Sequence, residues 1–300
     1  MTLHNIKQQN PWTNIIRNQE GNYIASCDNV NITVDKKSGK SFLFGSDAYA
    51  HKINKNNCNL TFKCLPEPFC GDPDSEVYLL GMNPGEPDSL FEIAANPCPP
   101  NNNEYLKRAY ANLRHDTYPP SIFPSYYWTS GLVIQTNSKH ISYDKHLFDN
   151  YINAVGKMKK QAAIKGYRPH VGALWQREKT TQLRKAAQKE DVRIFSLEYF
   201  PYHSKSGFEF PDNLPSYAYR NLLLEYAMDT DKYIIIMRQE GKWYNIGDRK
   251  IGARLKDYEK KLILKNKQGG WISSNNLMLP LPATKQKCRC ISWDDIIRVL

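Results

Sequence analysis

Residues 77–85, VYLLGMNPG, join an apolar run to a turn made of glycine, asparagine, proline and a second glycine. An apolar run without alternation is typical of a parallel strand that is covered on both faces. We therefore predict a central strand over residues 77–80, ended by a turn that Pro84 and Gly85 shape. Ligands of open parallel sheets bind beyond the carboxyl ends of the strands, so Asn83 lies where a site is expected.

The same pattern returns further along the chain. Three more short apolar runs predict strands at residues 192–197, 233–237 and 262–264. Helical patterns occupy residues 104–113, after a capping Asn103, and residues 145–166 and 178–190. Strands that alternate with helices predict a three-layer α/β/α sandwich with a central, mainly parallel four-stranded sheet.

The N-terminal part has a different character. Residues 21–34, GNYIASCDNVNITV, alternate in polarity, and a basic turn, KKSGK, separates them from SFLF at residues 41–44. This pattern predicts a β-hairpin with a basic tip. We predict a β-rich N-terminal extension over residues 1–70, packed on an α/β domain over residues 71–300 that carries an insertion around residues 97–140.

The composition favours a nucleic-acid partner. The chain has 41 Lys and Arg against 30 Asp and Glu, a net charge of +11, and 19 Tyr. Basic side chains attract a phosphate backbone and aromatic rings stack on exposed bases, so DNA is the expected partner. The alternative is that the excess lysine only keeps the protein soluble. No stretch approaches the roughly 18 apolar residues that a membrane helix needs, so no membrane partner is expected.

The cysteines indicate a reducing compartment. Their number, seven, is odd, and the N-terminus lacks the apolar segment of a signal peptide, which predicts a cytoplasmic protein. Cys58, Cys64, Cys70 and Cys98 lack the close pairing of a strong metal motif. Reduced structural thiols are therefore favoured over a metal site, and we expect no metal and no cofactor.

The second predicted strand is followed by polar and aromatic residues. Glu198, Tyr202 and His203 lie within EYFPYHSKSG, residues 198–207, and combine a carboxyl group, stacking rings and a titratable imidazole. In the structural alternative the rings fill the core and His203 binds a backbone group. Glu198 is harder to explain that way, because a carboxylate is costly to bury unless something donates to it.

The remaining two strand ends are basic. Arg238 ends the third strand, and Asn266, Lys267 and Trp271 follow the fourth in a glycine-containing loop. An aromatic residue on such a loop could insert into a base stack. The structural alternatives are a surface ion pair for Arg238 and packing of Trp271 against its own loop.

The ordered strand ends resemble those of a known family. LLGMNPG, residues 79–85, resembles the first motif of the uracil-DNA glycosylase superfamily, particularly its single-strand-selective and mismatch-specific branches. EYFPYHSKSG resembles the motif that follows the next sheet strand, and LPEPFCGDPDS, residues 65–75, leads into the first. The resemblance runs in patches from about Leu65 to Leu279. It implies an enzyme that flips out a nucleotide and hydrolyses its N-glycosidic bond, leaving an abasic site.

The resemblance assigns roles to three residues. Asn83 falls where the family places the residue that positions the attacking water, and Gly85 where strict uracil enzymes keep a tyrosine that blocks substituents at C5. Glu198 falls where the family has the asparagine that pairs with uracil. An ionised Glu198 only accepts hydrogen bonds and should prefer an amine such as cytosine N4. The implied substrate is a C5-substituted cytosine, such as a hypermodified phage base, and the implied role is defence against phages.

Other expected site residues lie at or between these strand ends. Asn266 is the nearest match to the family's last motif, where many members have His-Pro-Ser. The further expectations are Asp88 or Glu86 as a general base; His203 or Lys267 as a group that stabilises the leaving base; Met82, Tyr118, Phe123 and Tyr202 as base contacts; and Lys205, Arg238, Lys267 and Trp271 as DNA contacts.

Three alternatives stay open at this point. The first is a repair glycosylase for uracil or another deaminated base, with Glu198 protonated or turned away. The second is a reader of flipped or single-stranded bases that does not hydrolyse them, and the third is a protein whose basic face binds RNA or a protein partner. The expected state is a monomer.

Overall fold

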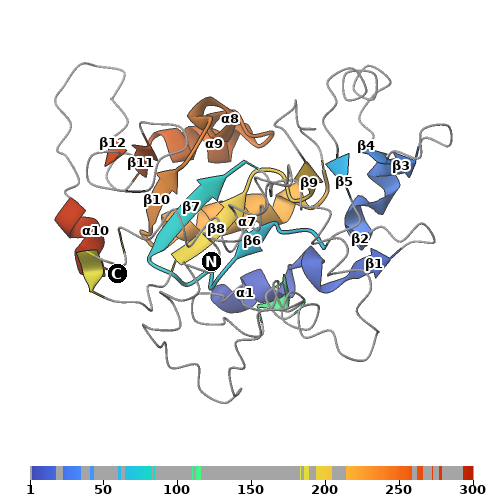
Figure 1. Ribbon diagram of the computed structural model, residues 1–300, viewed down its shortest axis with the longest axis horizontal. Coiled ribbons are helices and arrows are strands. Elements are labelled where there is room, and N and C mark those ends of the chain that lie inside the picture. Colours follow the sequence, from blue (N-terminus) through green and yellow to red (C-terminus); the bar gives the residue numbers. More distant parts are fainter. Residues whose placement is uncertain are drawn as a thin grey trace, which may run out of the picture.

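A mixed sheet forms the centre of the computed structural model (Figure 1). Its strand order is β12-β11-β10-β7-β8-β6, and the four inner strands are parallel to one another. These are β11 (Leu262–Lys265), β10 (Tyr233–Ile236), β7 (Val77–Gly81) and β8 (Ile194–Glu198). The edge strands β12 (Leu277–Met278) and β6 (Phe69–Cys70) are antiparallel to their neighbours. The four predicted strands are confirmed, and the fold is α/β.

The structure describes residues 2–17, 23–34, 41–43, 60–61, 65–82, 84, 110, 113–115, 183, 186–188, 194–204, 214–258, 262–265, 272, 277–278 and 293–299.

The strand order places a topological switch in the middle of the sheet. The chain passes from β7 to its neighbour β8 and then crosses to β10, on the opposite side of β7. In an open parallel sheet, a crevice forms where two neighbouring strands are followed by connections that run in opposite directions along the sheet. The crevice lies beyond the carboxyl ends of those two strands. In this sheet that place is the carboxyl end of β7 and β10, with the end of β8 beside it.

The longest described helix, α7 (Tyr217–Asp229), precedes β10 and packs on the sheet behind β7 and β8 (Figure 1). The sequence patterns did not predict it. The other described helices are α1 (Leu3–Gln8), α8 (Glu240–Tyr244), α9 (Arg249–Lys256) and α10 (Trp293–Val299). Within the predicted helices 104–113 and 178–190, Tyr110, Leu113, Leu183 and Ala187 are helical, while residues 145–166 lie outside the described part.

Strands β7, β8 and β10 bury apolar residues on both sides of the sheet, because both sides are covered. Tyr78 and Leu80 of β7 join a large buried cluster with Leu223 and Leu224 of α7. The alternate residues of these strands point to the other face of the sheet. They form a second buried cluster with α10 and with residues of the chain before β8. Its buried members are Val77, Leu79, Leu183, Ile194, Ile235, Met237, Ile272 and Ile296.

The strands of the N-terminal segment form short antiparallel pairs, two within the segment and one with a strand that follows β8. They are β1 (Ile15–Arg17) with β2 (Tyr23–Ala25), β3 (Ile32–Val34) with β4 (Ser41–Leu43), and β5 (Leu60–Thr61) with β9 (His203–Ser204). The predicted hairpin around the basic turn is confirmed by β3 and β4. Between β2 and β3, however, residues Ser26–Asn31 form the 3-10 helix η2, so the strand predicted over 21–34 is interrupted.

The interruption has a physical cause in Asp28. Its side chain is fully buried and accepts hydrogen bonds from two distant parts of the chain. A straight strand would place alternate side chains on opposite faces, whereas the 3-10 turn allows this carboxyl group to point into the core. The segment also includes the 3-10 helix η1 (Pro11–Thr13), and Ile6, Trp12 and Ile24 belong to the large buried cluster.

Among the residues that the structure describes, no helix has the length and apolar character needed to cross a membrane.

Candidate functional site

The Glu198 carboxyl group lies against Gly81 at the carboxyl end of the sheet. Glu198 is the last residue of β8, and the parallel register places it directly opposite Gly81, the last residue of β7. A Cβ atom built on Gly81 would overlap both carboxyl oxygens of Glu198. The carboxyl group can therefore occupy this position only because residue 81 has no side chain.

The main chain around Glu198 is held on both sides. The Glu198 N–H donates to the Pro68 carbonyl oxygen at 2.9 Å. Beyond β8, the Tyr199 N–H donates to the Gly81 carbonyl oxygen at 3.3 Å and the Phe200 N–H to that of Met82 at 2.8 Å. These bonds keep the chain after Glu198 alongside Gly81 and Met82.

The Glu198 side chain has an unused hydrogen-bonding atom. The residue as a whole keeps some accessible surface, but Oε2 is enclosed and has no hydrogen-bond partner among the residues described. Burial, followed by the negative charge of Glu67, raises the pKa of Glu198 from 4.5 to about 8, against the opposing effect of Arg238. The carboxyl group is therefore mostly neutral at pH 7. The expectation of an ionised Glu198 is corrected, because the ionised form would be desolvated and would face a like charge.

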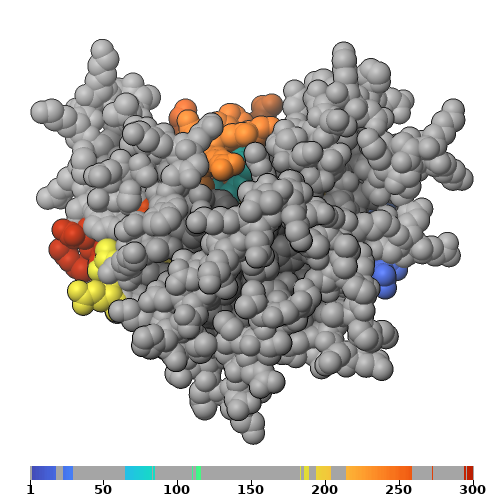
Figure 2. Space-filling view, in the orientation of Figure 1, coloured from blue at the N-terminus to red at the C-terminus, as the bar shows by residue number. Residues whose placement is uncertain are grey.

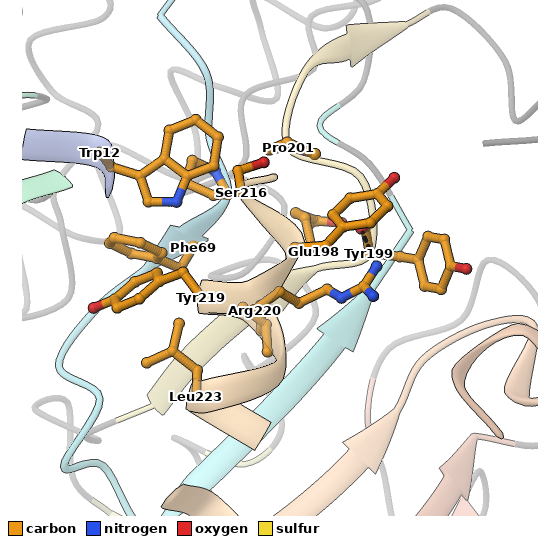
Figure 3. A pocket seen from close by; sticks show the side chains of 12 residues that line it. Trp12, Phe69, Glu198, Tyr199, Pro201, Ser216, Tyr219, Arg220 and Leu223 are labelled. Carbon is orange, nitrogen blue, oxygen red and sulfur yellow. Dashed lines mark hydrogen bonds between the residues drawn. The ribbon is translucent and has the colours of Figure 1, made fainter. Parts of the chain in front are cut away.

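A crevice adjoins Glu198 on the side of α7 (Figure 3). Arg220 of α7 crosses it and donates from Nη1 to the Tyr199 carbonyl oxygen at 2.9 Å. The Arg220 guanidinium carbon lies 4.0 Å from the ring centroid of Tyr217 and 4.6 Å from that of Tyr199. Buried Arg220 thus ties the segment after Glu198 to the helix. The crevice lining also includes Trp12, Pro68, Phe69, Leu197, Pro201, Ser216, Tyr219 and Leu223.

Tyr202 and His203 make the contacts of structural residues. The Tyr202 ring is 1% exposed, and its hydroxyl donates to Asp28 Oδ2 at 2.8 Å. His203 is also buried, with Nε2 3.0 Å from the Leu65 carbonyl oxygen. These contacts agree with the structural alternative, in which the rings fill the core and His203 binds a backbone group. The described surroundings leave the Tyr202 ring no free face on which a base could stack.

Asp28 connects the N-terminal segment to the chain that follows Glu198. Its Oδ1 accepts from the Ser216 N–H at 2.9 Å, and the Cys27 thiol lies 3.7 Å away. Burial raises the pKa of Asp28, while the hydrogen bonds from Ser216 and Tyr202 oppose that rise. Asp28 therefore joins η2, the segment after β8 and the start of α7 in one buried cluster.

Two other expected site residues are described. Met82 is buried immediately after β7. Arg238 is exposed two residues after the end of β10, and it lies near enough to Glu198 to affect its titration. The remaining expected residues lie outside the described part of the chain: Asn83, Gly85, Glu86, Asp88, Tyr118, Phe123, Lys205, Asn266, Lys267 and Trp271.

The surface is hollowed near this end of the sheet. In Figure 2, teal atoms from the stretch 65–84 lie at the floor of a hollow, beside orange atoms from the stretch 214–258. Figure 1, in the same orientation, draws the carboxyl end of β7 at that place. The strand end that precedes Asn83 is therefore at the base of a recess in the molecule.

The described residues contain no group of three His, Cys, Asp or Glu side chains that could hold a metal ion. Cys27 and Cys70 are thiols that form no disulfide. Burial raises the pKa of Cys70, and the nearby Glu67 and Glu198 add to this rise.

Comparison with known proteins gives no relative for this chain: no family model, no curated protein and no solved structure matches it.

Sequence reasoning missed Gly81 and Glu67 as parts of this site. The sequence alone indicates a turn at Gly81, although a glycine that ends a buried strand can also signal close approach by a neighbouring group. Glu67 lies far from Glu198 in the sequence, and its proximity depends on how the segment before β6 packs beside β8.

The raised pKa of Glu198 predicts a pH-dependent stability. The folded state binds the Glu198 proton more tightly than the unfolded state, so stability falls as pH rises from 4.5 to about 8. Glu198→Gln, which is neutral at every pH, is expected to increase the free energy of unfolding at pH 8 by at least about 2 kcal/mol. Denaturant unfolding at pH 4 and pH 8 measures this, and the difference should vanish at pH 4. Equal stability of the two proteins at pH 8 would show that the carboxyl group is hydrated.

Proposed function

We propose that this protein is a DNA glycosylase of the uracil-DNA glycosylase type, which flips out a C5-substituted cytosine and hydrolyses its N-glycosidic bond. The observation that carries the proposal is the buried Glu198 carboxyl group, which lies across Gly81 beside the segment that leads to Asn83. A polar group with an unused atom, placed at the switch point of a parallel sheet, is suited to contact a ligand.

The finer architecture belongs to this proposal. Helices on both faces of the sheet would make three layers, with residues 1–70 as a β-rich extension of a domain over residues 71–300. The buried clusters on the two sides of β7 support the layers, and the contacts of Asp28 support packing of the extension on the core.

The proposed reaction breaks the bond between the sugar C1′ and the base nitrogen. Water attacks C1′, the bonding electron pair leaves with the base, and the products are an abasic site and a free base that has gained a proton. The transition state has oxocarbenium character, so groups that stabilise the leaving base and orient the water accelerate it. From the sequence, Asn83 orients the water, and absence of a tyrosine at Gly85 leaves room for a C5 substituent. Excision of modified phage bases would serve in defence.

The test is release of a base from defined DNA. Oligonucleotides with one uracil, cytosine, 5-methylcytosine, 5-hydroxymethylcytosine or glucosylated 5-hydroxymethylcytosine are incubated with the protein and then treated with alkali. We expect strand cleavage only with a C5-substituted cytosine, and mass spectrometry of the supernatant identifies the base. Asn83→Ala should reduce the rate at least about 100-fold. DNA binding that is unchanged in Asn83→Ala, with no abasic product from either protein, would instead support a non-catalytic reader.

One observation favours a second candidate, a glycosylase for uracil or another deaminated base. Glu198 is mostly neutral at pH 7, and a neutral carboxyl group can donate to a carbonyl oxygen as well as accept from an N–H. Efficient excision of uracil in the same assay would favour this candidate over the modified cytosine.

A further inference from the structure

The Glu198 carboxyl group offers two adjacent oxygens at one place. Both overlap the position that a Cβ atom on Gly81 would take, and Oε2 is enclosed without a hydrogen-bond partner among the described residues. A carboxyl group held this way needs partners for both oxygens, because a buried polar atom without one costs about 1–3 kcal/mol. A bound base edge can supply both partners.

Two charged groups from separate segments of the described chain act on this carboxyl group, and a neutral thiol lies near it. Glu67, before β6, contributes a negative charge; Cys70, in β6, is a thiol whose own ionisation is suppressed; and Arg238, after β10, contributes a positive charge. β7 contributes Gly81 and is followed by Met82, and neither residue is charged. With Glu67 and burial outweighing Arg238, the carboxyl group keeps its proton at pH 7.

A neutral carboxyl group has one O–H donor and one carbonyl acceptor. Cytosine presents an acceptor at N3 beside a donor at N4, while uracil presents a donor at N3 beside an acceptor at O4. Because the proton can reside on either oxygen, the same group can pair with both edges. An ionised carboxylate has no donor, so one of its oxygens would face a lone pair of either base.

We propose that Glu198, whose carboxyl group occupies the space that Gly81 leaves open, recognises the Watson–Crick edge of the flipped base as a neutral carboxyl group, donating one hydrogen bond and accepting another. The substrate class is then a pyrimidine with one donor and one acceptor at positions 3 and 4, whether 4-amino or 4-oxo. Choice between pyrimidines falls to the rest of the pocket, such as the space at C5. This inference rests on the proposed glycosylase function.

The test is the pH dependence of excision by the wild type and by Glu198→Gln, measured as kcat/KM from pH 6.5 to 9 on the substrate found above. The wild type should lose activity about tenfold per pH unit above pH 8. Glutamine keeps one donor and one acceptor, so Glu198→Gln should retain activity within about tenfold of the wild type at pH 7 and show no such loss. Any loss of activity with pH that remains in Glu198→Gln therefore reports titration of another group, such as the base itself.

Two more variants complete the test. Glu67→Gln removes the like charge and should move the loss of activity to lower pH, which a merely structural role would not do. Glu198→Ala removes both hydrogen bonds and should lose activity at every pH. An increase of wild-type activity through pH 8, together with loss of activity in Glu198→Gln at pH 7, would overturn the inference and support recognition by the ionised form.

A measurement without turnover separates failure of this inference from failure of the proposed function. The infrared difference spectrum between the wild type and Glu198→Gln should contain the C=O band of a protonated carboxyl group at pH 7, and the band should disappear above pH 8. Base release without this band overturns the inference alone. If the band is present but no DNA releases a base, the proposed function is overturned. Recognition of a base by Glu198 is then overturned as well.

Discussion

Gly81→Ala is expected to reduce base excision by at least about 100-fold, because misplacement of a site group by about 1 Å can cost that much. The new methyl group would occupy the position of the Glu198 carboxyl group, whose oxygens overlap the Cβ position. The Glu198 side chain must then turn away, or β8 must move away from β7, with which it is paired at this position. The measurement is kcat/KM on the substrate identified by base release.

Two controls separate this effect from a general effect of alanine. Gly241 in α8 has open space around its Cβ position, so Gly241→Ala should leave activity unchanged and stabilise the helix by up to about 1 kcal/mol. Gly81→Ala itself should destabilise the protein by about 1–3 kcal/mol, as overpacking does. In a Glu198→Ala background this cost should almost disappear, because the group that collides with the methyl is gone. An equal cost in both backgrounds would show that the methyl group strains another part of the sheet.

Asp28→Ala is expected to lower the free energy of unfolding by about 3 kcal/mol. The substitution removes the acceptor of the buried Tyr202 hydroxyl and of the Ser216 N–H. Both donors would then be buried without a partner, and the link between η2 and the chain after Glu198 would be lost. Part of the cost is offset because the carboxylate itself is desolvated, as the raised pKa of Asp28 indicates. Urea unfolding at pH 7 measures the difference.

Conservative variants test whether Asp28 stabilises the protein as the acceptor for Tyr202 and Ser216. Asp28→Asn keeps an acceptor for Ser216 and should cost about 1 kcal/mol. Tyr202→Phe removes the hydroxyl that donates to Asp28 and accepts from the Ala25 N–H at 3.3 Å, and should cost about 1.5 kcal/mol. If Asp28→Ala were as stable as the wild type, the cluster would contribute nothing and the N-terminal segment would be held by its apolar contacts.

The sheet could be predicted because strands at its centre need an apolar composition. Strands covered on both sides must be apolar at every residue, so the runs that became β7, β8, β10 and β11 could be recognised without structural information. Helix α7 was missed because it is buried on more than one side and includes Tyr217, Arg220 and Tyr226 among its buried residues. Such a helix lacks the polar face that makes an amphipathic pattern visible.

Other errors came from contacts between distant residues. Alternation over residues 21–34 predicted a continuous strand, but the 3-10 helix η2 lets Asp28 reach Tyr202 and Ser216. Tyr202 and His203 were expected to face a ligand because they follow a strand. Their partners, Asp28 and the Leu65 carbonyl, come from segments whose approach no local pattern reveals.

The residues alone predicted which strand ends lie together at one edge of the sheet. Glu198 and the Asn83 turn follow apolar strands, and parallel strands bring their carboxyl ends to one edge of a sheet. The protonation state of Glu198 depended on folding, because it results from burial and from the charges of Glu67 and Arg238, which lie on separate segments. Electrostatic energies depend on distance and on exclusion of water, and only the packing of β6, β7, β8 and β10 sets both. The same packing makes Gly81 part of the site, since the space it leaves open is filled from another strand.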